Sequence, residues 1–196
     1  MMYTVLGSTK NRTLRVIWTL EELGVTYDQV VGDPGSAKVK ALNPTGKVPA
    51  LIVEGEVLPD SVAIMTFLSD RHNALTFQAG SVERLRMDGH IHFLLEEFDS
   101  LLWVAAKNSF INPVERRAAE VKPILKWEFE RSLKRLEERL QGEYLMGDTF
   151  TISDILAAHC LNWASNAKFP EAGEVLTAYV DRCCNRAAYK RALADK

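Results

Sequence analysis

The amino-acid sequence predicts an α/β domain followed by an all-α domain. Within residues 1–76, short apolar runs typical of β-strands alternate with stretches of helical periodicity. From residue 82 to residue 196, the periodic stretches repeat their apolar residues at intervals of three and four, which is the spacing of helices. Between these parts, residues 72–81 show no periodicity and are interpreted as a linker. We therefore expect two domains, with boundaries at 1–76 and 82–196.

The length and composition are those of a globular protein. The 196 residues are enough for one large domain or two small ones, and 47% hydrophobic with 26% charged residues is an ordinary balance. A net charge of −2 gives no electrostatic basis for binding nucleic acid or an anionic membrane. No apolar run approaches the roughly 20 residues that span a bilayer, and the first residues lack the features of a signal peptide. We expect a cytoplasmic protein without nucleic-acid or membrane partners.

The first 32 residues predict a β-α-β unit. Tyr3–Gly7 is a short β-type run, and the apolar residues of 13–23 share one helical face. Gly24 suits the position that follows a helix, and 25–31 is a second β-type run. Such a unit implies parallel strands joined by a right-handed crossover.

A turn, a hairpin and a helix follow. Residues 43–47 carry proline and glycine, which suit a tight turn. Val48–Val53 and Glu56–Leu58 are apolar runs on either side of a glycine, which is a hairpin signal. Asp60-Ser61 then provides N-cap chemistry for a helix that runs to residue 71. The resulting order, β-α-β-(α)-β-β-α, is that of a thioredoxin-like domain.

The remaining sequence is helical. Helical periodicity extends over 87–105 and again over 114–140, where Pro123 should either kink the helix or mark its true start. Thr151 and Asp154 have the spacing of a capping box, with Phe150 placed to pack against the first turn of an apolar helix that we expect to be buried. The last 25 residues suggest two short helices joined near residue 185.

Two pairs of residues in the first domain are candidate binding groups. A proline at a strand entrance exposes the backbone groups beside it, here those of Val48 next to Pro49. Asp60 and Ser61 combine a carboxylate and a hydroxyl with the free N–H groups and favourable dipole of a helix N-terminus. Together they suit a ligand that carries both an amine and a carboxylate. The alternative is that Asp60 and Ser61 only cap the helix.

This stretch resembles the glutathione-binding half of the cytosolic glutathione S-transferases. The resemblance rests on Asn43-Pro44, Gly46–Leu51, the hairpin and Asp60-Ser61, and it continues through Gly147–Asp154 in the second part. Family members more often have Glu at the position of Asp60. The resemblance implies glutathione as the co-substrate, no metal, and glutathione binding by Lys47, Val48, Pro49, Asp60 and Ser61.

The turn at Ser8–Arg12 is the candidate catalytic segment. The first domain contains no cysteine, which excludes thioredoxin-type and cysteine-type chemistry. Ser8 lies seven residues before Arg15, and this spacing resembles the catalytic turn of the serine-type, bacterial-like transferases, in which the hydroxyl stabilises the glutathione thiolate. Many such proteins have proline where this chain has Thr9. The candidates for contact with the sulfur are therefore Ser8, Thr9 and Asn11, unless Ser8 only caps the first helix.

The resemblance also implies an electrophile pocket, a homodimer and a role in detoxification. Trp103, Lys107 and Phe110, with Arg12 from the catalytic turn, would line the pocket for a small hydrophobic electrophile, although ordinary packing or surface exposure is an equal alternative for the first three. Cys160, Cys183 and Cys184 form no zinc-type pattern and are interpreted as buried, inert thiols.

The expected function is activation of the glutathione thiolate for attack on small electrophiles. Two alternatives remain open: another glutathione-dependent reaction on the same fold (isomerase, lyase, dehalogenase or peroxidase), and a non-catalytic module that binds protein partners.

Overall fold

The computed structural model describes residues 2–194, which form two compact units. The first unit comprises the chain up to Ala79 and again from Cys183, and the second runs from Gly80 to Arg182. The first is α/β and the second is helical, so the predicted fold class is confirmed. The residues from Cys183 onward belong in space to the first unit. The functional domain boundaries 1–76 and 82–196 stay a prediction.

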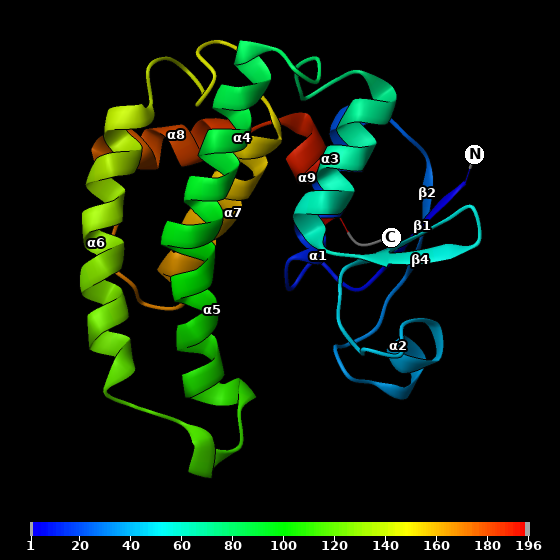
Figure 1. Ribbon diagram of the computed structural model, residues 1–196, viewed down its shortest axis with the longest axis horizontal. Helices are drawn as coiled ribbons and strands as arrows, with labels where there is room; N and C mark the ends of the chain where they lie inside the picture. Colours follow the sequence, from blue (N-terminus) through cyan, green and yellow to red (C-terminus); the bar gives the residue numbers. More distant parts are fainter. Residues whose placement is uncertain (1, 195–196) are drawn as a thin grey trace. The chain divides into compact units, whose positions relative to one another are not determined.

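A mixed four-stranded sheet lies at the centre of the first unit (Figure 1). Its strands are arranged in the order β2-β1-β3-β4. The β1–β2 pair is parallel and the other two pairs are antiparallel, as the predicted β-α-β unit and hairpin require. The strands are β1 (Tyr3–Leu6), β2 (Tyr27–Val30), β3 (Ala50–Val53) and β4 (Glu56–Pro59).

Helices cover both faces of this sheet. Val39 of α2 (Ala37–Leu42) packs with Leu6 and Ala50, which are cross-strand partners in β1 and β3. Because successive side chains of a strand point to opposite faces, the neighbouring Val5 and Leu51 are buried on the other face. That face is covered by α1 (Thr13–Leu23) and α3 (Ser61–His72), which contact β1, β3 and each other. Figure 1 shows α2 apart from these two helices.

The last helix of the chain packs against the first. Two short helices, α8 (Glu174–Cys184) and α9 (Ala187–Leu193), occur where the sequence predicted them. The ring of Tyr189 meets that of Trp18 edge to face, with centroids 4.6 Å apart. Arg186 donates to both carboxylate oxygens of Glu22 at 2.6 and 2.7 Å, and Arg191 donates to Glu21 at 2.9 Å. The sequence pattern predicted these helices but not their packing on α1.

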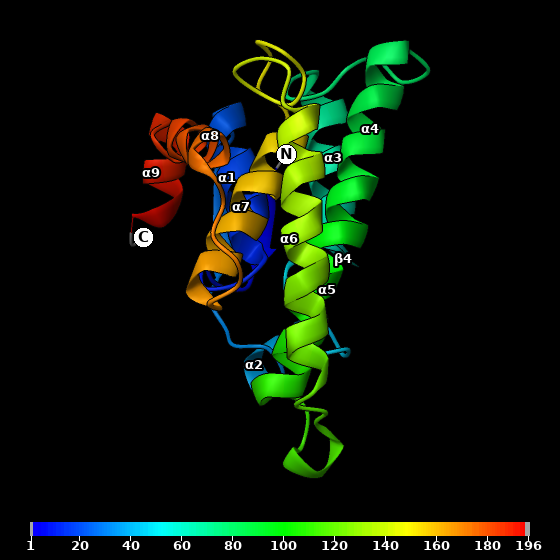
Figure 2. The ribbon, with the colours of Figure 1, turned by 90° about the vertical axis from the view of Figure 1, so that its left-hand side faces the viewer.

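The second unit is built from helices only. Figures 1 and 2 both show α5 beside α6, and the predicted long helix over 87–105 occurs as α4 and α5 joined by a π-helical turn. Pro123 lies in the first turn of α6, where its missing N–H costs nothing, so it marks the start of the helix rather than a kink. The elements are α4 (Val82–Leu94), η1 (Leu95–Asp99), α5 (Ser100–Ala106), η2 (Lys107–Ile111), η3 (Val114–Arg116), α6 (Val121–Arg139) and α7 (Ile152–Asn166).

Aromatic side chains and α7 form the core of this unit. The rings of Phe98, Phe129 and Phe169 meet edge to face in succession, with centroids 5.0 and 5.2 Å apart. Most of α7 is buried, as its apolar sequence predicted. None of the helices in the described part of the chain is both long and apolar enough to cross a membrane.

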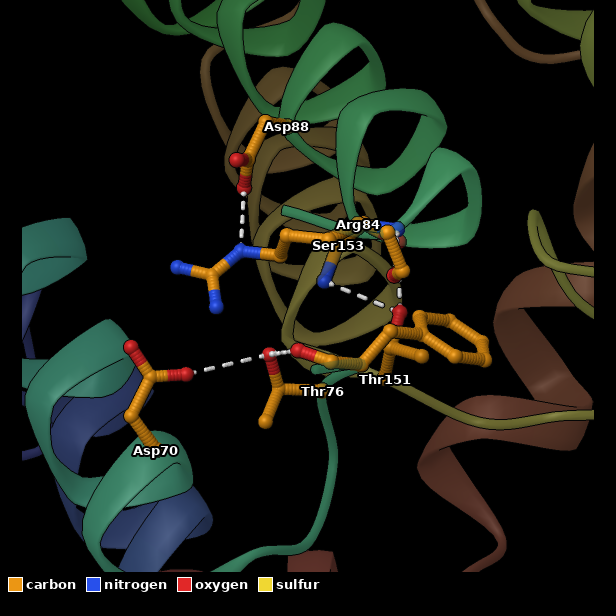
Figure 3. Close-up of polar contacts among 8 residues, drawn as sticks. Asp70, Thr76, Arg84, Asp88, Thr151 and Ser153 are labelled. Atoms are coloured by element: carbon orange, nitrogen blue, oxygen red, sulfur yellow. Dashed lines mark hydrogen bonds and ion pairs between the residues drawn. The ribbon is translucent and has the colours of Figure 1, made fainter. Parts of the chain in front are cut away.

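The capping box at the start of α7 is confirmed. Thr151 Oγ1 accepts a hydrogen bond from the Ser153 N–H, at 3.3 Å (Figure 3). Asp154 accepts in return from the Thr151 N–H at 2.8 Å, and its other oxygen accepts from the Leu145 N–H and the Tyr179 hydroxyl at 2.9 and 2.8 Å. Burial raises the pKa of Asp154, and these hydrogen bonds offset part of that effect. Asp154 therefore ties together three segments of the second unit.

Candidate functional site

The turn after β1 approaches the loop before β3 very closely. Gly7 has φ 126°, and its N–H donates to Val30 O while its C=O accepts from the Gln29 side chain. A Cβ at Gly7 would lie 3.0 Å from Val48 Cβ and 2.3 Å from Thr13 Oγ1. Only glycine fits this conformation and this contact. The turn and Val48 are therefore neighbours, as the predicted fold requires.

The three candidate catalytic residues differ in how their polar groups are used. Ser8 Oγ is buried and forms no hydrogen bond with any described residue. Asn11 Oδ1 accepts from the Thr13 N–H at 3.0 Å and from Thr13 Oγ1 at 2.7 Å, so it satisfies an N–H in the first turn of α1. Thr9 is half-buried. A buried hydroxyl without a partner is costly, and Ser8 is the member of this turn whose buried hydroxyl lacks a partner among the described residues.

The loop before β3 leads into a cis peptide bond between Val48 and Pro49. Pro49 is buried, Val48 is half-buried and Lys47 is exposed. None of the hydrogen bonds among the described residues uses the Val48 N–H or C=O. These backbone groups can therefore pair with a ligand, and Val48 lies beside the turn that follows β1.

Asp60 and Ser61 lie at the N-terminus of α3. Asp60 Oδ1 accepts from the N–H groups of Val62 and Ala63, both at 2.9 Å, so the capping role is present and Oδ2 retains its acceptor capacity. Asp60 has φ 79°, a conformation that costs a non-glycine residue about 1–3 kcal/mol and is found mostly at functional sites.

The side chain of Arg15 contacts Ser61. Arg15 is 1% exposed, and its Nη1 donates to Ser61 Oγ at 3.3 Å. Because Oγ accepts this hydrogen bond, the hydroxyl proton of Ser61 remains available to a carboxylate. The sequence pattern included Arg15 only as part of the spacing from Ser8, and no local signal indicated that it contacts Ser61, which is 46 residues away.

The remaining predicted residues belong partly to the second unit. Trp103 lies on α5 and is 37% exposed, Lys107 is half-buried, and Phe110 is 68% exposed on η2. Arg117 holds this end of the helix by donating to Asn112 O at 2.7 Å and to Phe110 O at 3.2 Å. Arg12 belongs to the first unit and is half-buried. The assignment of these residues to an electrophile pocket stays a prediction.

The cysteines and the groups with shifted pKa values are not among the predicted site residues. Cys160 and Cys183 are buried and Cys184 is half-buried. Burial, with Cys184 as a neighbour, raises the pKa of Tyr189 to about 12. Among residues 2–194, no cluster of three His, Cys, Asp or Glu side chains is arranged to hold a metal ion.

Known proteins match both parts of the chain. The family model for the glutathione S-transferase N-terminal domain matches residues 12–71, and that for the C-terminal domain matches residues 85–187. The Escherichia coli O157:H7 protein named glutathione S-transferase GstA is 29% identical over 189 residues, which is 90% of each chain. Glutathione S-transferase 3 of Schizosaccharomyces pombe is 28% identical, over 92% of this chain and 71% of its own.

Solved structures agree with these matches. A glutathione transferase from Methylococcus capsulatus has a TM-score of 0.80 and 26% identity, covering 97% of this chain and 96% of its own. The theta-class enzyme of Xanthomonas axonopodis pv. citri, solved with glutathione bound, has a TM-score of 0.77 and 25% identity, covering 99% and 98%. With both domain models matched in order, and the C-terminal one alone spanning more than half of its residues, the chain belongs to the glutathione S-transferase family.

Proposed function

We propose that this glutathione transferase binds glutathione along Val48, Asp60 and Ser61 and activates its thiol with Ser8, for attack on a small electrophile. The observation that carries the proposal is the buried Ser8 hydroxyl, which has no partner among the described residues and lies in the turn that contacts Val48. Glutathione is the co-substrate of the family, and related structures contain it.

The proposed step requires the thiol to ionise at neutral pH. A free thiol has a pKa near 8.5, so only a few per cent of it is thiolate. A hydroxyl that donates to the thiolate stabilises the charged form, and a hydrogen bond to an ion contributes about 1.5–3 kcal/mol. Each pKa unit corresponds to about 1.4 kcal/mol, so Ser8 alone accounts for a shift of one to two units. The N-terminus of α1, which begins at Thr13, adds a favourable field.

The proposed binding groups match the opposite charges of the γ-glutamyl end of glutathione. The uncommitted Oδ2 of Asp60 accepts from the α-amino group. The Ser61 hydroxyl donates to the α-carboxylate, and the buried Arg15 behind it adds positive charge to this side of the ligand. The backbone of Val48, next to Pro49, pairs with the middle of the tripeptide, and the exposed Lys47 is near enough in sequence to meet its glycine carboxylate.

The finer features of the function rest on the family resemblance. We extend the proposal to a pocket for a small hydrophobic electrophile lined by Arg12, Trp103, Lys107 and Phe110, to a homodimer, and to detoxification in the cytoplasm. Sedimentation at several concentrations tests the dimer. Protection of Trp103 fluorescence from a soluble quencher by S-substituted glutathiones tests the pocket.

Two measurements on the purified chain test the core of the proposal. Calorimetry with glutathione separates a glutathione-binding enzyme from a module that binds only proteins. Turnover with a panel of aryl halides, epoxides, hydroperoxides and cis-double-bond isomerisation substrates then separates the transferase from the peroxidase and isomerase alternatives. A chain that binds glutathione but conjugates none of the electrophiles would overturn the transferase assignment.

A further inference from the structure

Asn43 is a buried polar residue at the start of the loop that leads to Val48. It is 5% exposed, and both the amide nitrogen and the amide oxygen of its side chain form hydrogen bonds within the loop. Asn43 Nδ2 donates to the carbonyl oxygen of Lys47 at 2.9 Å. Its Oδ1 accepts from the Thr45 N–H at 3.3 Å and from the Thr45 hydroxyl at 2.9 Å. One side chain therefore sets the path of the four residues that follow it.

The backbone of the loop is braced around this side chain. The Gly46 N–H donates to Asn43 O at 2.8 Å, and the Gly35 N–H donates to Gly46 O at 2.8 Å. A Cβ at Gly46, which has φ 69°, would lie 3.2 Å from Gly35 Cα. The Gly35 backbone thus holds the loop at Gly46, and the Asn43 side chain holds it at Thr45 and Lys47.

The hydrogen bond from Asn43 to the Lys47 carbonyl also determines the direction of the Val48 N–H, because both groups belong to the same peptide unit. The peptide bond is trans and planar, so its C=O and N–H point in opposite directions. With the Lys47 carbonyl turned toward Asn43, the Val48 N–H points away from the loop interior. That N–H has no hydrogen-bond partner among the described residues. The backbone and side-chain polar groups of Asn43, in contrast, are hydrogen-bonded.

We propose that Asn43 is a positioning residue for glutathione, which acts by holding the Lys47–Val48 peptide so that the Val48 N–H is presented to the ligand. The inference rests on the proposed binding of glutathione at Val48. It assigns Asn43 no contact with the ligand and no part in ionising the thiol. Its loss therefore lowers affinity without changing the pKa of bound glutathione.

Asn43→Asp is the sharpest test, because it keeps the size of the side chain. The carboxylate still accepts from Thr45 but cannot donate to the Lys47 carbonyl, and the two oxygens repel each other at the observed distance. We expect the dissociation constants of glutathione and of S-methylglutathione, measured by calorimetry, to rise about tenfold, as for one lost hydrogen bond of about 1.4 kcal/mol. Lowering the pH toward the carboxyl pKa restores a donor, so the ratio of the variant's dissociation constant to that of the wild type at the same pH should fall. In turnover, KM for glutathione should rise while kcat changes little.

Thr45→Val is the matched control. It removes the two hydrogen bonds made by the Thr45 hydroxyl but leaves the Asn43–Lys47 contact. We expect its melting temperature to fall and its affinity for glutathione to stay within about twofold of the wild type, well under the tenfold effect of one hydrogen bond.

Three results would overturn the inference without touching the proposed function. These are an Asn43→Asp variant that binds S-methylglutathione like the wild type, a loss of affinity relative to the wild type that does not shrink at acid pH, and a loss of the same size in Thr45→Val. If Asn43→Asp does not fold, amide exchange in the wild type decides: saturating glutathione must slow exchange of the Val48 N–H, and an unchanged rate in a chain that binds glutathione refutes the inference together with the proposed contact at Val48. A wild-type chain that binds no glutathione refutes the proposed function instead.

Discussion

Replacing Ser8 with alanine removes one hydroxyl from a site where the free protein gives it no partner. The Ser8 Oγ is buried and unbonded among the described residues, and an unsatisfied buried polar group costs about 1–3 kcal/mol. The Ser8→Ala variant without ligand should therefore be at least as stable as the wild type. This distinguishes Ser8 from a helix cap, whose loss destabilises by about 0.5–2 kcal/mol.

The effect on bound glutathione should be large. If the hydroxyl donates to the thiolate, its loss removes about 1.5–3 kcal/mol of stabilisation, which raises the pKa of the bound thiol by one to two units. Thiolate absorbance near its ultraviolet maximum, followed through a pH titration of the complex, measures this shift directly. Turnover at neutral pH should fall about ten- to a hundredfold and partly recover as the pH rises. The affinity for S-methylglutathione should not change, because Asp60, Ser61 and Val48 are intact.

Two neighbours serve as controls. Asn11→Ala removes the acceptor for the Thr13 N–H, so it should lower stability by about 0.5–2 kcal/mol and leave the pKa of the bound thiol unchanged. Thr9→Ala should change neither quantity. The assignment of Ser8 as the catalytic hydroxyl would be refuted if Ser8→Ala left the pKa of bound glutathione and the turnover unchanged while Thr9→Ala or Asn11→Ala shifted that pKa. If none of the three variants changes the pKa of bound glutathione, the thiolate is stabilised by backbone groups and the start of α1.

The other predictions concern the two helix caps. Asp60→Ala and Ser61→Ala should each weaken glutathione binding about tenfold or more, as measured by calorimetry. Asp60→Asn keeps the helix cap but removes the charge, so full glutathione affinity in that variant would mean that Asp60 only caps the helix. Asp154→Ala should lower the melting temperature and keep near-normal specific activity in the folded fraction, whereas loss of turnover with unchanged stability would place Asp154 in the site. Because burial raises the pKa of Asp154, the stability linked to its protonation is present below the unfolded-state pKa and is lost as the pH rises through the raised value. Urea unfolding should therefore show the advantage of the wild type over Asp154→Asn shrinking as the pH rises through that window, and a growing advantage would mean that the pKa is lowered.

Local sequence signals predicted most of the first unit. The proline and glycine positions, the apolar runs and the Asp60-Ser61 pair each act over a few residues, so the strands, the hairpin and the start of α3 were predicted close to their observed bounds. The capping box of α7 is a signal of the same kind. The sequence left two roles for Pro123, because a proline suits the first turn of a helix as well as a kink. The structure shows that Pro123 lies in the first turn of α6.

The contacts that support the candidate site could not be predicted in this way. Arg15 meets Ser61 across 46 positions, and Gln29 meets Gly7 across 22. Such pairings depend on how the strands are ordered in the sheet rather than on any pattern in the neighbouring residues. Asn43 was visible in the sequence as part of a turn, but its hydrogen bond to the Lys47 carbonyl depends on the loop being clamped by Gly35. Local patterns could thus point to candidate residues for binding glutathione, but not to the long-range contacts that hold these residues in place.

The packing of α9 on α1 affects how the protein is made. During synthesis, the sheet and α1 emerge from the ribosome first, yet the helix that covers Trp18 emerges only after the whole helical unit has been translated. Domains usually fold in the order in which they are synthesised. Until α9 emerges, Trp18 lacks its ring contact with Tyr189, and Glu22 and Glu21 lack their ion pairs with Arg186 and Arg191. The first unit therefore gains the packing of α9 on Trp18 only after the helical unit has been synthesised.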